Sequence, residues 1–140
     1  MSLQPLLDAT PAIQWHAFAA FAAFVLGIVQ FAAPKGTVPH RTLGWIWVVL
    51  MALVALSSFF IHNICMIGPF SLIHLLSIMT LVLLPIGVWQ ARRHKVRSHR
   101  RMMQGIFVGA LIIAGIFTFV PGRIMHDVAF GTQAKHGSCW

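Results

Sequence analysis

Four long apolar stretches dominate this sequence and limit what it can fold into. Each approaches the roughly 20 residues that an α-helix needs to cross a bilayer. Apolar side chains surround each stretch on all sides instead of forming one stripe, which is typical of membrane spans. Only 9% of the residues are charged, which is too few for a soluble domain of this size. The sequence therefore predicts an all-α membrane protein with four transmembrane helices, at about residues 13–33, 42–61, 70–90 and 103–120.

The connections between these stretches are short, so neighbouring helices must run antiparallel in one four-helix bundle over residues 1–140. Six Arg and Lys residues lie in the third connection, Lys35 and Arg41 lie in the first, and none lie in the second. This bias places the first and third connections in the cytoplasm, with the second connection and both termini outside. Because the basic groups sit in short loops, they predict contact with the lipid bilayer and not with nucleic acid.

Histidines recur at matched positions in the two halves of the sequence. His16 and His40 are 24 residues apart, and His74 and His99 are 25 apart. His16 and His74 lie near the starts of the first and third helices, whereas His40 and His99 open the second and fourth. This regularity suggests a duplicated helical hairpin.

The paired histidines predict a haem site at each end of the bundle. In an antiparallel bundle His16 and His74 lie at one depth, and His40 and His99 at the other. Two imidazoles facing each other across a bundle core have the geometry that ligates haem iron. The sequence thus predicts one or two haems b, with the basic side chains nearby as contacts to haem propionates or lipid phosphates: Arg41, Arg100 and Arg123. Small residues after His16 form one helix face, which suits either a flat macrocycle or plain helix packing; they are Ala19, Ala20, Ala23 and Gly27.

Other interpretations of these residues remain open. A histidine near a helix end is often an interfacial residue, and Gly105–Gly109 is a helix-packing pattern by default. Imidazole, thiolate and thioether groups near the outer face suit copper, although their spacing matches no compact motif; they are His62, Cys65, Met66 and His126. The alternatives are therefore a haemless structural or assembly subunit and a copper- or zinc-handling membrane protein.

Two short segments resemble the signatures of a bacterial family of predicted four-helix membrane proteins of unknown function. His40-Arg41-Thr42-Leu43-Gly44 is similar to its HRxLG element, which opens the second helix. His99-Arg100-Arg101-Met102-Met103 is similar to its HRxWM element, with Met102 in place of the usual Trp. The order of one histidine per helix more loosely resembles the two-haem membrane cytochromes b, in which the first helix pairs with the third and the second with the fourth. The first resemblance implies the topology and a location in a bacterial inner (plasma) membrane, and the second implies bis-histidine haem ligation.

These observations favour a membrane-bound b-type cytochrome-like protein that transfers electrons between the two membrane faces. Its class would be that of a membrane oxidoreductase, with a quinone or a redox protein as partner. The spans contain no carboxylate and no phosphate-binding loop, so nothing points to a hydrolase or a transferase. The electron donor and acceptor stay open, as does the choice between a homo-oligomer and a subunit of a larger complex.

Overall fold

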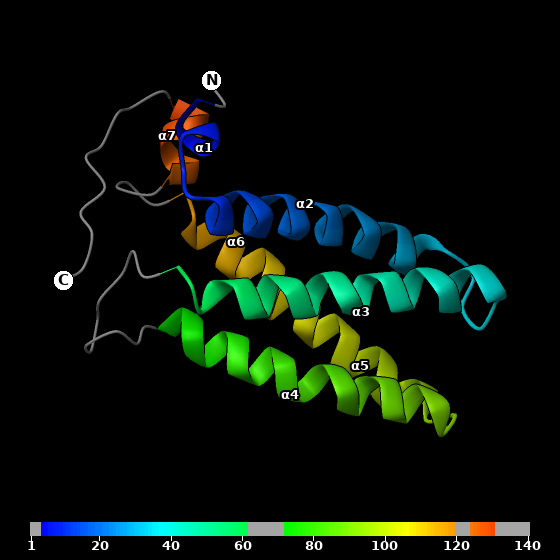
Figure 1. The fold of residues 1–140 in the computed structure, drawn as a ribbon. Coiled ribbons are helices and arrows are strands. Elements are labelled where there is room, and N and C mark those ends of the chain that lie inside the picture. The colour runs from blue at the N-terminus through cyan, green and yellow to red at the C-terminus, as the bar shows by residue number, and fades with distance from the viewer. Residues whose placement is uncertain (1–3, 62–71, 120–123, 131–140) are drawn as a thin grey trace.

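The computed structural model describes residues 4–61, 72–119 and 124–130. Four of its helical segments are long and apolar enough to cross a membrane, which confirms the predicted all-α membrane fold. The first three are α2 (Pro11–Ala32), α3 (Val38–Ser58) and α4 (Leu72–Arg92). The fourth consists of α5 (Val96–Ile106), the π-helical η1 (Phe107–Ile113) and α6 (Ala114–Phe117). Two short helices outside the spans, α1 (Gln4–Leu7) and α7 (Ile124–Phe130), pack against each other (Figure 1).

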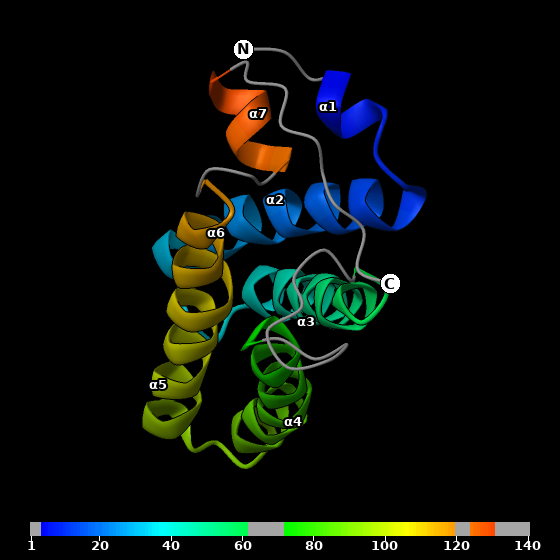
Figure 2. The ribbon, with the colours of Figure 1, turned by 90° about the vertical axis from the view of Figure 1, so that its left-hand side faces the viewer.

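Consecutive spans run in opposite directions, as their short connections require (Figure 1). α3 packs against both α2 and α4, and it lies between them in the end view of Figure 2. The fourth span packs against α4 and, through η1, against α2. We call the end with the connections 33–37 and 93–95 the basic end, and the end at which α2 and α4 begin the terminal end. The histidines near the helix starts therefore alternate between the terminal end and the basic end.

Polar residues extend two spans beyond their apolar stretches at the basic end. α3 begins at Val38, where the Thr37 hydroxyl accepts a hydrogen bond from the backbone N–H of His40 at 3.3 Å. The fourth span begins at Val96 and not near residue 103, because arginine and methionine are strong helix formers even where hydropathy is low. His40 and His99 therefore lie on helical turns, at fixed positions on their helices.

The centre of the bundle is filled with protein side chains. Ala23 is fully buried, and its carbonyl accepts a hydrogen bond from the Trp47 indole at 2.9 Å. Gly27 lies directly against the ring of Phe107, so that a methyl group added there would approach Phe107 Cδ2 to 2.6 Å. For Ala23 and Gly27, the helix-packing interpretation of the small-residue face is therefore confirmed.

The π-helical segment supplies much of this packing. Phe107 stacks on Phe24, with ring centroids 5.7 Å apart, and meets Phe31 edge-on at 5.0 Å. By contrast, a side chain added at Gly105 or Gly109 would meet nothing within 4 Å in the described part of the chain. The Gly105–Gly109 pattern thus faces away from the other helices of the bundle.

Candidate functional site

His40 and His99 come together at the basic end. The Thr37 cap holds His40 in the first turn of α3, and His99 lies in the first turn of α5. Their imidazole rings are close enough to interact electrostatically. Both are half-buried. The structure thus brings this predicted pair together, although each residue begins its helix.

The ring of His99 is oriented by a backbone carbonyl of the neighbouring helix. Its Nδ1 lies 2.9 Å from the carbonyl oxygen of Gly87 on α4. A carbonyl only accepts hydrogen bonds, so Nδ1 carries the proton and Nε2 keeps its lone pair. Gly87 is itself buried against Met102 and Met103, and a side-chain carbon added there would meet the flexible end of Met103.

Three buried acceptor atoms at the basic end have no hydrogen-bond partner among the described residues. They are Oε1 of Gln30, Nδ1 of His40 and Oε1 of Gln90, one each from α2, α3 and α4. Gln30 is joined to His40, because its Nε2 donates to the His40 carbonyl at 2.9 Å. Gln90 follows Gly87 by three residues and so shares its helix face. Unpaired buried polar atoms are costly, so each of these three atoms would be stabilised by a hydrogen-bond partner.

Neither glutamine was among the predicted site residues. The available signal was that each is an amide in an otherwise apolar span, at corresponding places in the two halves, 60 residues apart. Gly44, one turn after His40, lies beside Gln30: a side-chain carbon added there would be 3.1 Å from Gln30 Nε2.

At the terminal end, His16 is bound to α3. Its Nδ1 lies 2.9 Å from the Ser57 hydroxyl, which itself donates to the carbonyl of Val54 at 3.0 Å. Since Ser57 has one hydroxyl proton and Val54 accepts it, His16 Nδ1 is the donor and its Nε2 keeps a lone pair. His16 therefore has the same tautomer as His99.

His74 is buried, with 4% of its surface exposed, and its ring lies 5.7 Å from that of Phe59 at the end of α3. One turn later, the Ser77 hydroxyl lies 2.6 Å from that of Ser58 and links α4 to α3. His16 and His74 thus both contact α3, and Figure 2 places α3 between the helices that carry them. The proximity of the two predicted partners is therefore better supported for His40 and His99 than for His16 and His74.

The remaining predicted residues are distributed over both ends. Arg41 and Arg100 are exposed beside His40 and His99. His126 lies in α7 with its ring 4.8 Å from that of Phe130. The other predicted contacts lie outside the described residues: His62, Cys65, Met66 and Arg123. Within the described ranges, no three His, Cys, Asp or Glu side chains are grouped as a metal site, and the copper hypothesis depends on residues beyond them.

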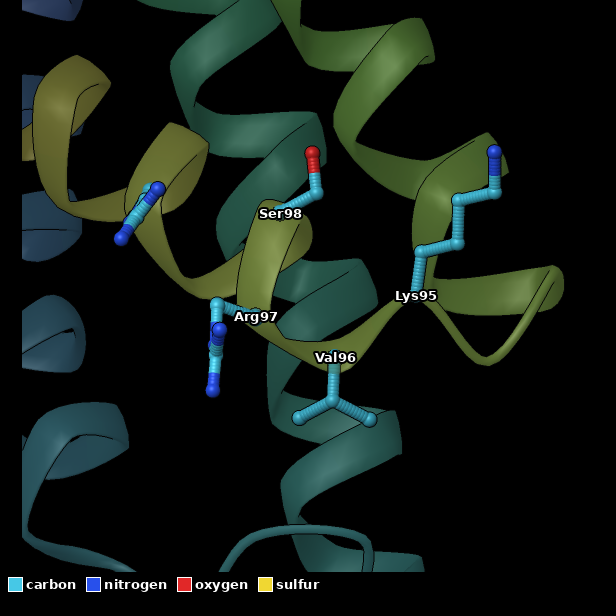
Figure 3. Close-up of a pocket in the computed structure, with 5 residues that line it drawn as sticks. Lys95, Val96, Arg97 and Ser98 are labelled. Carbon is cyan, nitrogen blue, oxygen red and sulfur yellow. The ribbon is translucent and has the colours of Figure 1, made fainter.

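A hollow at the start of α5 is lined by basic residues without forming a converging site. Lys95, Val96, Arg97, Ser98 and Arg101 surround it. Figure 3 shows Lys95 and Arg97 directed away from each other. This arrangement is typical of a solvated, positively charged face next to lipid headgroups.

Comparison with known proteins identifies the family and nothing closer. A family model described as "Predicted membrane protein (DUF2306)" matches residues 13–140. No curated protein and no solved structure matches the chain. The match spans all four membrane helices and both histidine pairs, and the chain therefore belongs to this DUF2306 family of predicted membrane proteins.

Proposed function

We propose that this chain is a membrane electron-transfer protein of the b-type cytochrome class, with a haem held between His40 and His99 at the basic end. The observation that carries the proposal is the state of His99, whose Nδ1 is bound to the Gly87 carbonyl and whose Nε2 is free. Metal-ligating histidines characteristically donate their second ring N–H to a carbonyl or carboxylate. His40 lies within electrostatic range and has a buried Nδ1 without a partner, and either ring nitrogen can ligate a metal.

The surroundings of this pair fit a haem. Arg41 and Arg100 are exposed next to the two histidines, where their guanidinium groups would pair with propionates. Met102 and Met103 lie on the Gly87 face beside His99, and thioethers pack well against aromatic rings. A haem bound there would supply reversible one-electron chemistry. A quinone or a redox protein would exchange electrons with it.

A second haem between His16 and His74 is the corresponding proposal for the terminal end. His16 supports it through its tautomer, fixed by Ser57, which leaves Nε2 available. Because α3 lies between the helices that carry these histidines, this haem is the less strongly supported of the two. With both haems bound, electrons would pass between the two faces of the membrane.

The competing proposal is a haemless structural or assembly subunit. It is favoured by the centre of the bundle, where Trp47 and Phe107 fill the space beside Ala23 and Gly27. The visible spectrum of the chain, purified from a host supplied with haem precursors, separates these proposals. Bis-imidazole ligation should give a low-spin Soret band and sharp bands on reduction with dithionite. A spectrum with no Soret band would leave the structural proposal standing, and copper absorption would favour metal handling.

The orientation in a bacterial inner membrane is also a proposal, and it rests on the basic connections. Reporter fusions at Lys95 should read as cytoplasmic, and fusions at Gly68 as external, because positively charged connections are retained inside. Both termini would then be external. The reverse pattern at both sites would overturn this orientation and leave the four spans intact.

A further inference from the structure

An apolar groove of about 370 Å³ runs along the outside of α3 and α4. Its wall includes Val48 and Ala52 from α3 and Leu81 and Pro85 from α4. The small side chain of Ala52 and the compact ring of Pro85 leave space that a leucine at either position would occupy. This groove lies apart from the histidine pairs and has no part in the proposed haem site.

Tryptophan and arginine form the end of the groove that lies at the basic end of the bundle. Trp45, Trp89 and Arg92 line this end. The Arg92 guanidinium carbon lies 5.7 Å from the centre of the Trp45 ring and so reaches from α4 to α3. Arg93 and Lys95 lie over Trp89, at 4.6 and 5.7 Å. Tryptophan favours the headgroup level of a bilayer, so this end of the groove lies at the membrane surface.

The chain offers few carboxylates to pair with these cations. The sequence contains only two acidic residues, Asp8 and Asp127. Asp8 directly follows α1, and Asp127 lies in α7, at the far end of the bundle (Figure 1). Anions from outside the chain would therefore be attracted to the positive charge around Arg92, and a membrane surface supplies anionic headgroups.

We propose that this groove binds an anionic phospholipid from the leaflet at the basic end. Arg92 and Arg93 would pair with its phosphate, and one acyl chain would lie along Val48, Ala52, Leu81 and Pro85. From Trp45 to Ala52, the groove follows α3 for about 10 Å, which fits within the roughly 15 Å depth of one hydrocarbon leaflet. An apolar wall that continues from a cationic end fits a phospholipid better than a free phosphate ion.

Brominated lipids test this proposal, because bromine on an acyl chain quenches the fluorescence of nearby tryptophans. The full chain is reconstituted in phosphatidylcholine vesicles that contain increasing fractions of brominated phosphatidylglycerol. Arg92→Gln should raise the fraction needed for half-maximal quenching about fivefold, as loss of one interfacial cation predicts. The matched control is Arg97→Gln, which removes the same charge from the exposed start of α5 and should raise this fraction clearly less, because Arg92 lines the groove and Arg97 does not.

A second variant keeps the charge and fills the groove. Ala52→Leu should reduce quenching by brominated phosphatidylglycerol, while circular dichroism shows that the helices remain. Equal weakening by Arg92→Gln and Arg97→Gln would overturn the proposal in favour of general attraction to the basic end. Undiminished quenching in Ala52→Leu, or relief of quenching by inorganic phosphate, would overturn the acyl-chain part. Each of these outcomes is independent of whether the chain binds haem.

Discussion

Replacing either His40 or His99 with alanine is expected to remove all haem absorbance that belongs to the basic end. A low-spin haem at this site would be held by both imidazoles, so removing either one would change its spin state or release it. With two haems in the wild-type protein, each single variant should lose about half of the low-spin Soret absorbance. The double variant should look like either single variant, because two ligands of one iron act as a unit. Reduced-minus-oxidised spectra, normalised to protein, measure this loss.

The control for this experiment is His94→Ala. His94 is exposed in the connection before α5 and has a φ of 55°; it lies outside both histidine pairs and should keep full absorbance. His16→Ala and His74→Ala should remove the other half of the spectrum if the terminal end holds a haem. Unequal losses from His40→Ala and His99→Ala would contradict their pairing. Full absorbance in both variants would exclude a haem at the basic end.

Gly27→Leu is expected to have the largest effect on stability. The ring of Phe107 and the indole of Trp47 already occupy the space beside Gly27, with Phe107 Cδ2 at 2.6 Å and Trp47 Nε1 at 3.1 Å from a hypothetical side-chain carbon. Neither ring can bend away as a flexible chain end would. The free energy of unfolding should fall by about 3 kcal/mol, the upper end of the cost of overpacking a core. Thermal unfolding in detergent, followed by circular dichroism, measures the change.

Gly105→Leu provides the matched control, because Gly105 has no atoms of the described chain within 4 Å of the position of an added side chain. This variant should stay within about 0.5 kcal/mol of the wild type, as for surface substitutions. Combining Gly27→Leu with Phe107→Ala should restore part of the lost stability, since the smaller residue removes the collision. Equal effects of Gly27→Leu and Gly105→Leu would show that α2 and η1 do not pack as described.

The membrane spans were predictable because hydropathy and length determine them. The exact residues at which the helices begin and end depend on local interactions instead. The polar start of α5 continues the fourth helix from Val96 to His99 without any apolar signal. The short helix α7 pairs with α1 through a tertiary contact between residues far apart in sequence, which no local pattern contains. The π-helical segment was not predicted for a similar reason, since its residues are those of an ordinary membrane helix.

The proximity of His40 and His99 was predictable from the sequence, whereas the surroundings of the two histidines were not. The repeat spacing was enough to pair His40 with His99 by depth. It could not show that Gly87 would supply a carbonyl to His99, because that contact depends on how α4 and α5 are rotated about their axes. The same holds for Gln30 and Gln90, whose buried amides are informative only once their unpaired oxygens are located.

The π-helical segment also affects how this fold tolerates insertions and deletions. In a π-helix each hydrogen bond spans one residue more than in an α-helix. The seven residues from Phe107 to Ile113 therefore rotate α6 about the helix axis relative to α5. The fourth span thus consists of two α-helical parts, α5 and α6, that are joined through the wider turns of η1. Deleting one residue within η1 would therefore restore a regular α-helix while α6 kept its present face and α5 and His99 kept their positions. A deletion in α5 has no such wide turn to absorb it and would turn the rest of the span by about 100°, the angle of one residue in a 3.6-residue turn.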